Sequence, residues 1–478
     1  MTITKDPLAE IPFVTNMSVG PADFREFTIS NFDGSAGLDV RGAIAEFYFY
    51  ESVLSNTISA TVVLVDTGYI ANSDVRDGEE DKEEVSAQKT PGLLSLLNLR
   101  GGERVDFEIV NSNPLSQGVI SVSSGMYINR IRDLGNASQK DMFALDLVPI
   151  EYIQNEKVRV TGKYEGKISE NIGSILNELN LNSMPLAVDP TAFDYNFIGN
   201  DRKPFYICTW LASKAVPEGV DDKGKSLSGG GAGYLFFQTK EFMCFRSIDK
   251  LLSKDPLDSV TKKPIKKYTY NNTGSAQRLR NGEDYQNILS YSFNKTIDIA
   301  KDLTLGSYNN RSIFFDPLSM NYQVVEFKFD DQKINYTNKL RSIPKVKNIT
   351  DSPTRLMSHV LDTGVMPSGT SSNDQLKAWK DDQTANNYDA KNIMVQSIMR
   401  YNQLFSIQLN IVVPGDFSIT AGSRIQCDFA DLTHSDRPDN QLSGIYMVAS
   451  VCHKTTTEDT FTSLDLVSDS LYGKKPNN

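Results

Sequence analysis

The chain has few of the side chains that carry metal or nucleophilic chemistry. Its 478 residues include four cysteines, three histidines and two tryptophans. The cysteines are Cys208, Cys244, Cys427 and Cys452, and none belongs to a Cys-x-x-Cys pair. Because zinc sites need such spacings or nearby histidines, we predict no metal site and four buried, reduced thiols. A disulfide between Cys427 and Cys452, which fall on neighbouring predicted strands, stays open.

Long hydrophobic runs are also missing. No stretch approaches the roughly 20 apolar residues of a membrane-spanning helix, so we expect no membrane insertion. The first residues, MTITKD, are polar and no apolar segment follows them, which predicts that there is no signal peptide. We expect the protein in the cytosol of the producing cell, or in a particle that assembles there.

A surplus of positive charge is absent as well. The net charge is −11, which argues against a general nucleic-acid-binding role, because neutralising phosphates requires Lys and Arg. Lys262, Lys263, Lys266 and Lys267 form a local basic cluster, and a solvated loop is the favoured interpretation. We therefore predict no specific binding of nucleic acid.

Motifs for catalysis are poorly represented. The histidines are His359, His434 and His453; a Ser-His-Asp triad is not excluded by spacing, but no Gly-x-Ser-x-Gly motif is present. Gly229–Gly233 lacks the Lys-Ser/Thr pair of a phosphate-binding loop and leads into a predicted strand. The acidic run at 79–84 lacks the spacing of an EF-hand. We predict no catalytic, cofactor-binding or metal-binding residues, no cofactor, and no enzyme activity.

One pattern of short β-type runs occurs twice. Residues 421–468 contain AGSRIQCDF, SGIYMVASV and FTSLDLVSD, and residues 101–148 contain GGERVDFEI, SGMYINRIR and FALDLVP. Tyr127 and Asp146 are separated by 19 residues, as are Tyr446 and Asp465. A predicted hairpin at 49–66 also has an echo at 312–330. The repeated order indicates an internal duplication.

The composition, 39% hydrophobic and 23% charged, is that of a globular protein long enough for about three domains. We predict a mainly β fold with α+β insertions: two similar small β-barrel domains and a middle α+β domain. The predicted division is an N-terminal arm 1–20, a first barrel 21–150 with an acidic loop 72–90, a middle domain 151–285, a second barrel 286–340 and 401–472, and a partly helical insertion 341–400.

Helices are predicted from apolar spacing and from Pro204 as a first helical residue. They cover 168–179, 204–215, 353–361 and 392–401, with one or two further turns at 93–99. A tight hairpin is predicted over 233–246, followed by a short helix capped by Ser247. The polar stretch 367–390 is expected to be a loop.

Several segments resemble a known family. Val413-Pro414-Gly415-Asp416, Ala421-Gly422, Ser443–Tyr446, His453-Lys454 and Phe461–Val467 are similar to the closing segment of the baseplate central hub proteins of contractile-tailed phages and related injection machines. Lys203–Leu211, Gly233–Phe237 and Phe245–Asp249 resemble the domain between the two barrels of those hubs. The resemblance covers about two-thirds of the chain.

The resemblance implies a structural virion protein in the tail baseplate, assembled in the host cytoplasm. In such hubs, two tube-like barrels per chain and three chains give a pseudo-sixfold ring. The ring adapts the hexameric tail tube, or its initiator proteins, to a trimeric central spike or cell-puncturing protein. The acidic loop 72–90 and the insertion 341–400 depart from the family pattern, so contacts with baseplate wedge proteins stay unassigned.

Two other functions compete with this one. Aromatic-rich strands also suit a receptor-binding or carbohydrate-binding tail protein, and abundant carboxylates suit a cell-wall-degrading enzyme. Binding to host cells or glycans would favour the former, and clearing of peptidoglycan the latter.

Overall fold

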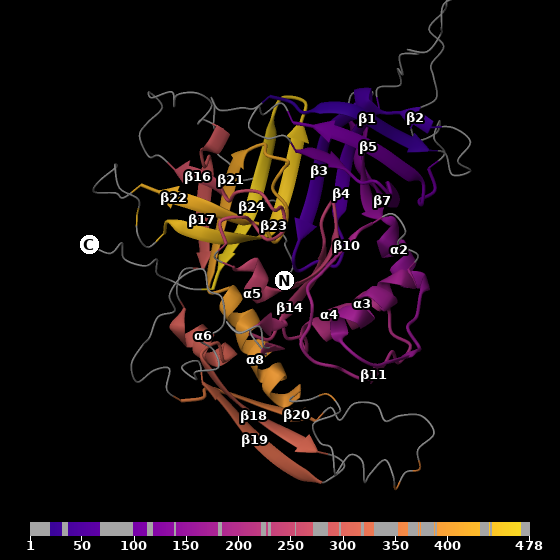
Figure 1. Ribbon diagram of the computed structural model, residues 1–478. Helices are drawn as coiled ribbons and strands as arrows, with labels where there is room; N and C mark the ends of the chain where they lie inside the picture. Colours follow the sequence, from indigo (N-terminus) through magenta and orange to yellow (C-terminus); the bar gives the residue numbers. More distant parts are fainter. Residues whose placement is uncertain are drawn as a thin grey trace, which may run out of the picture.

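The computed structural model of the chain (Figure 1) describes residues 20–469 with internal gaps. The gaps are 31–36, 67–98, 112–117, 138–139, 180–183, 221–225, 228–230, 254, 271–284, 296–297, 317–319, 329–351, 362–370, 372, 374–386, 388–389, 431–438 and 440–441. The predicted arm up to residue 19, the acidic loop 72–90, the helical turns at 93–98 and most of the loop 367–390 lie outside the described residues.

The fold is mainly β, as predicted, and its largest sheet has 14 strands. The order is β17-β21-β24-β23-β3-β4-β8-β7-β5-β1-β2, with β22 and β16 branching from β23, and β6 from β5. The strands are β1 (Asp23–Ser30), β2 (Gly37–Asp39), β3 (Ile44–Ser52), β4 (Ser59–Asp66), β5 (Arg104–Val110), β6 (Val119–Ser121), β7 (Met126–Ala137), β8 (Lys140–Pro149), β16 (Lys266–Tyr270), β17 (Ser290–Lys295), β21 (Ile407–Pro414), β22 (Arg424–Phe429), β23 (Gly444–Thr456) and β24 (Thr460–Ser468).

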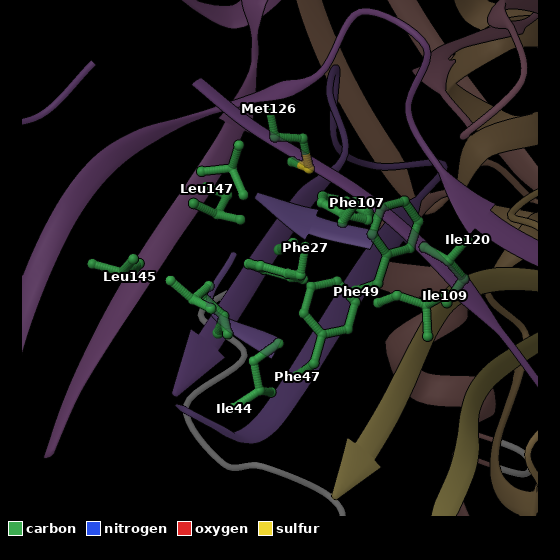
Figure 2. Close-up of a cluster of buried hydrophobic side chains, with 14 of the residues drawn as sticks. Phe27, Ile44, Phe47, Phe49, Phe107, Ile109, Ile120, Met126, Leu145 and Leu147 are labelled. Carbon is green, nitrogen blue, oxygen red and sulfur yellow. The ribbon is translucent and has the colours of Figure 1, made fainter. Parts of the chain in front are cut away.

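Alternating apolar residues form the first hydrophobic core (Figure 2). Phe47 and Phe49 of β3 point to the same side of the strand and are fully buried. The Phe27 ring of β1 stacks on Phe107 at 5.6 Å between centroids and meets Phe47 at 5.9 Å. Since β1 pairs with β5 and not with β3, these contacts show that the sheet curls around the core.

Two blocks of five antiparallel strands share the same order. The first is β5-β7-β8-β4-β3 and the second is β22-β23-β24-β21-β17. A β-bulge follows Ile128 in β7 and Val448 in β23. Equivalent facing pairs are Arg104–Tyr127 and Arg424–Met447, Ile128–Leu147 and Val448–Leu466, Ala60–Leu147 and Leu409–Leu466, and Phe49–Ala60 and Phe293–Leu409.

This register corrects the predicted match of Tyr127 with Tyr446. Tyr127 corresponds to Met447, and Tyr446 corresponds to Met126. Tyr446 and Met126 are both fully buried, whereas Tyr127 is partly exposed. A shift of one residue moves a side chain to the other face of a strand, so burial decides the alignment.

Two further expectations are wrong. The described strands form open sheets and not two closed barrels, because β3 pairs with β23 of the other block. The hairpin at 312–330 is β18 (Asn309–Asp316) and β19 (Asn321–Lys328), which do not take the places of β3 and β4. The strands in those places are β17 and β21, which are adjacent in the sheet although residues 296–406 separate them in sequence.

The hairpin β18–β19 belongs to a small sheet within this intervening segment. Its third strand is β20 (Arg355–Val360), which pairs parallel to β18, so the helix predicted at 353–361 is wrong. The segment also contains α6 (Ile299–Leu305) and α8 (Ala390–Leu404). The helix predicted at 392–401 is thus confirmed. Figure 1 shows α8 between the large sheet and the small one, which projects at the bottom of the view.

The middle of the chain is the predicted mixture of helices and short strands. The helices predicted at 168–179 and 204–215 are confirmed as α3 (Ile168–Asn177) and α4 (Pro204–Ala212). The predicted hairpin is β14 (Tyr234–Gln238) and β15 (Met243–Ser247), and Ser247 accepts a hydrogen bond from the Lys250 N–H at the start of α5 (Ile248–Leu251). Further elements are α2 (Ile150–Lys157), β9 (Lys163–Tyr164), β10 (Leu186–Val188), β11 (Phe197–Ile198), β12 (Gly219–Val220) and β13 (Ser226–Leu227).

Two hydrophobic cores serve this middle region. One lies between α3, α4 and the β14–β15 hairpin. The other joins the hairpin and α5 to the second block and to α8, and contains Phe237, Ile248, Leu404 and Met447. The middle region is therefore packed against the second block.

Candidate assembly surfaces

The structure describes two of the three histidines, His359 and His453. His453 is fully buried, with Nε2 3.3 Å from the Ile419 carbonyl oxygen and Nδ1 3.0 Å from the Thr462 hydroxyl. Burial, together with the positive charge of Lys240, lowers the pKa of His453 to about 3, so its ring is neutral. His359 lies on β20, and His434 lies outside the described residues. The His453 ring therefore packs inside the fold in its neutral form.

The glycine run and the lysine cluster of the sequence form contacts within the fold. The Gly231 N–H donates to the Asp249 carboxylate at the entry to β14, while 228–230 and the acidic run 79–84 are not described. Lys266 and Lys267 lie on β16 and not in a loop, and they form ion pairs with Asp416 and Asp428. In the described residues, no three His, Cys, Asp or Glu side chains are grouped to hold a metal ion. None of the described helices has the length and apolar character needed to cross a bilayer.

The cysteine positions exclude the disulfide that the sequence left open. Cys427 on β22 faces Gly444, at the start of β23. Cys452 lies eight residues further along the same strand, which at the usual rise places it about 26 Å away. A disulfide needs α-carbons within about 7 Å of each other.

The two blocks are joined edge to edge by β23 and β3. The first part of β23 pairs with β22, and its second part pairs antiparallel with β3, from Ser450–Ser52 to Thr456–Glu46. The Ser52 and Ser450 hydroxyls are 2.8 Å apart at one end of this joint. At the other end the Lys454 ammonium lies 5.0 Å from the centre of the Tyr48 ring. The joint makes one continuous sheet of the two blocks.

Buried charges hold the middle region against this joint. Glu51, on β3, accepts hydrogen bonds from the backbone N–H groups of Lys240 at 2.8 Å and Ala421 at 2.9 Å. The Lys240 ammonium donates to the carbonyl oxygens of Val119, at 3.0 Å, and Phe417. Burial raises the pKa of Glu51 and lowers the pKa of Lys240, which the attraction between the two charges opposes.

A second buried carboxylate, Asp416, anchors the loop before β22. It receives hydrogen bonds from Lys266, Tyr268 at 2.7 Å and Ser418 at 2.7 Å. Burial alone would raise the pKa of Asp416, but the charge of Lys266 and these hydrogen bonds lower it to about 2. Sequence reasoning missed this network, because its members come from two segments about 150 residues apart, β16 and the loop before β22, and no local spacing marks them.

The large sheet has two open edges among the described residues. After Ile128, β7 pairs with β8 on one side and with no described strand on the other. From Ser290 to Lys295, β17 pairs with β21 on one side, and the other side lacks a described partner strand. Leu134 on β7 and Tyr291 on β17 are 49% and 40% exposed. Unpaired N–H and C=O groups along such edges are templates for pairing with another chain.

The small sheet presents an apolar outer face. Facing pairs align Phe315 with Tyr322 and Val360, and Ile313 with Val324. Tyr322, Leu356 and Val360 are more than 60% exposed, whereas Phe314, on the opposite face, packs against α8. An apolar group of this kind on a projecting element is typical of an interaction surface.

No family model and no curated protein matches the sequence. Among solved structures, a tail protein of Neisseria meningitidis MC58 is similar over 94% of this chain and 97% of its own, with 10% identity and a TM-score of 0.47. The 43 kDa tail protein of prophage MuSo2 from Shewanella oneidensis is similar over 93% and 98%, with 7% identity and a TM-score of 0.45.

A third solved structure is a component of the type VI secretion system of E. coli, which is structurally similar to the bacteriophage T4 tail proteins gp27 and gp5. It is similar over 95% of this chain and 79% of its own, with 8% identity and a TM-score of 0.36. The names of these three neighbours describe tail proteins and a secretion-system component.

Proposed function

We propose that this protein is a structural component of a contractile phage tail, the central hub of its baseplate, and that it acts through its surfaces and not through catalysis. The observation that carries the proposal is the pair of five-strand blocks with matching register, joined edge to edge by β23 and β3. We propose that the blocks arose by internal duplication. The segments that resemble hub proteins, from Val413 to Val467, include most of the second block.

Matching register gives the blocks similar surfaces, so one chain supplies two similar positions around an axis. Three chains then supply six, and this is the proposed homotrimer with pseudo-sixfold symmetry. One face of the ring meets the hexameric tail tube or its initiator proteins. The other face keeps threefold symmetry and takes a trimeric spike.

The sheets suggest how the chain is divided in this assembly. We propose a first ring domain around the core of Phe27 and Phe47, a middle α+β domain, and a second ring domain that contains β16, β17 and β21–β24. The segment 296–406 is then an insertion between β17 and β21. Its projecting sheet is the proposed place for contacts with other baseplate proteins.

The oligomeric state tests this proposal. Light scattering of the purified protein, alone and with the spike protein of the same particle, should give the mass of three chains, about three times 53.2 kDa. A monomer that binds neither spike nor tube protein would contradict it. Glycan-array binding or adhesion to host cells would instead support the receptor-binding alternative, for which the exposed Tyr322 and Phe315 are candidate contacts.

A further inference from the structure

The joint between the two blocks shows which kind of strand can pair with the free edge of β7. In the second block, β23 is the strand equivalent to β7, and its edge beyond the bulge is covered by β3. Arg132 of β7 faces Ala144, and Cys452 of β23 faces Ser463. With Ile128 equivalent to Val448, Arg132 therefore holds the place of Cys452. Cys452 faces Tyr50 across the joint.

The strand equivalent to β3 in the second block is β17. Phe49 and Phe293 face the equivalent residues Ala60 and Leu409, and both contribute to the core of their block. The next facing pairs are Tyr50–Ser59 and Lys295–Gln408, so Lys295 holds the place of Tyr50. The side of β3 that meets β23 corresponds to the open side of β17.

The β7 edge and the β17 edge of one chain cannot meet each other. They lie in different blocks, and six strands separate them in the order of the sheet: β21, β24, β23, β3, β4 and β8. Figure 1 shows β17 on the left of the view and β7 on the right. A β7 edge can therefore be covered by β17 only when the β17 belongs to another copy.

We propose that β7 of one copy pairs antiparallel with β17 of the next copy, in the register that β23 and β3 use within the chain. Arg132 then faces Lys295, and Asp133 faces Phe293. The charge of Arg132 is already balanced within its own chain by Asp146, with the guanidinium nitrogen 2.7 Å from the carboxylate oxygen. The exposed Leu134 and Tyr291 become covered.

This contact is head-to-tail, because the two edges differ. Each copy offers one β7 edge and one β17 edge, so repetition closes a ring when the rotation per copy divides a full turn. The inference rests on the proposed function for the number of copies, but the pairing of the two edges is independent of that number.

Cysteine cross-linking tests the register. Facing residues of an antiparallel pair have β-carbons about 4.5–5.5 Å apart, within reach of a disulfide after small movements. Two versions of the chain with tags of different size, one with Arg132→Cys and one with Lys295→Cys, are co-expressed, purified and oxidised. We expect a disulfide-linked heterodimer, and no cross-linked species from either variant expressed alone.

Two matched controls fix the interpretation. Tyr50→Cys faces the native Cys452 within one chain and should lose both thiols on oxidation, which shows that the geometry permits the bond. Ser292→Cys, three residues from Lys295 on the same edge, should not link to Arg132→Cys. Cross-linking of Arg132→Cys chains to each other would overturn the head-to-tail contact.

A chain carrying both Arg132→Cys and Lys295→Cys distinguishes failure of the contact from failure of the trimer. We expect a covalent ladder that ends at three chains. Trimers by light scattering without any cross-link, while the Tyr50→Cys control closes, would overturn the β7–β17 pairing and leave the hub proposal standing. A ladder that continues beyond three would keep the pairing and overturn the threefold ring. Monomers without cross-links would overturn both.

Discussion

The surroundings of His453 keep its imidazole ring neutral. The ring is fully buried beside Phe417, with ring centroids 5.2 Å apart, and both nitrogens lie near hydrogen-bonding oxygens. The charged groups nearest to it oppose each other: Lys240 lowers the pKa of His453 and Asp416 raises it. Burial is the largest cause of the shift, and it leaves the neutral ring as the folded form at physiological pH.

This shift predicts a loss of stability in mild acid. The pKa of His453 is about 3 in the folded chain, below the ordinary 6.5, so the unfolded chain binds a proton more readily. The contribution to stability is present above pH 6.5 and is lost as the pH falls toward 3. For this residue we expect about 2 kcal/mol between pH 7 and pH 5. Urea denaturation at both pH values measures it.

The matched variant is His453→Gln, which has no charge to gain. Its stability should change less between pH 7 and pH 5 than that of the wild type, by about 2 kcal/mol. Comparing the two proteins removes the effect of buried carboxyls such as Glu51 and Asp249, whose pKa values are raised by burial. Equal pH dependence in both proteins would contradict the prediction.

At the scale of elements, the small sheet β19-β18-β20 has one buried face and one exposed face. Phe314 and Phe315 are neighbours on β18 and point to opposite faces, with 3% and 40% exposure. Phe314 packs with Val395 and Met399 of α8. The two residues form a natural pair for separating packing from surface contacts.

Phe314→Ala should destabilise this part of the protein by about 3 kcal/mol, because it leaves a cavity between the sheet and α8. Phe315→Ala should change stability by about 0.5 kcal/mol or less. Hydrogen exchange of the amides of β18 and α8 measures both effects. Similar exchange rates in the two variants would show that α8 does not rely on this face.

Secondary structure could be predicted from the sequence where one apolar face of the element packs into the core. Ile168, Ile172 and Ile175 give a helical stripe, and α3 buries all three. Residues 355–360 contain apolar residues at spacings that also fit a helix, yet they alternate in exposure as β20. Pairing with β18 decides that segment, and a pairing partner more than 40 residues away leaves no local sign in the sequence.

Contacts between distant segments also left no local sign of the candidate surfaces in the sequence. The repeated pattern of strands and turns at 101–148 and 421–468 could be recognised from the sequence, because turns and alternating strands have local signals. The joint of β23 and β3 could not, and neither could the contact of Glu51 with Lys240, because both depend on how distant segments meet. The echo of the first hairpin at 312–330 was misleading, since aromatic and β-branched strands resemble one another whatever sheet they join.

At the scale of the whole molecule, one arginine links three parts of the chain. Arg400 of α8 contacts Asp249 of α5 at 3.0 Å and Asp469, just after β24, at 2.9 Å. All three side chains are at most 7% exposed. The inserted segment, the middle region and the second block are thus held by one buried ionic group.

Arg400→Met should destabilise the protein by about 3–5 kcal/mol, because it leaves two carboxylates buried without their arginine. Adding Asp249→Asn and Asp469→Asn removes those charges and should restore a large part of the loss, since the three side chains then have no uncompensated charge. Urea denaturation measures the changes in the free energy of unfolding, and hydrogen exchange shows which amides lose protection. If Arg400 couples the three parts, the amides of α5, α8 and β24 exchange faster together in Arg400→Met and recover together in the triple variant. Faster exchange confined to α8 would show that the inserted segment is held independently of the two blocks, and the projecting sheet would then move freely relative to the ring that we propose.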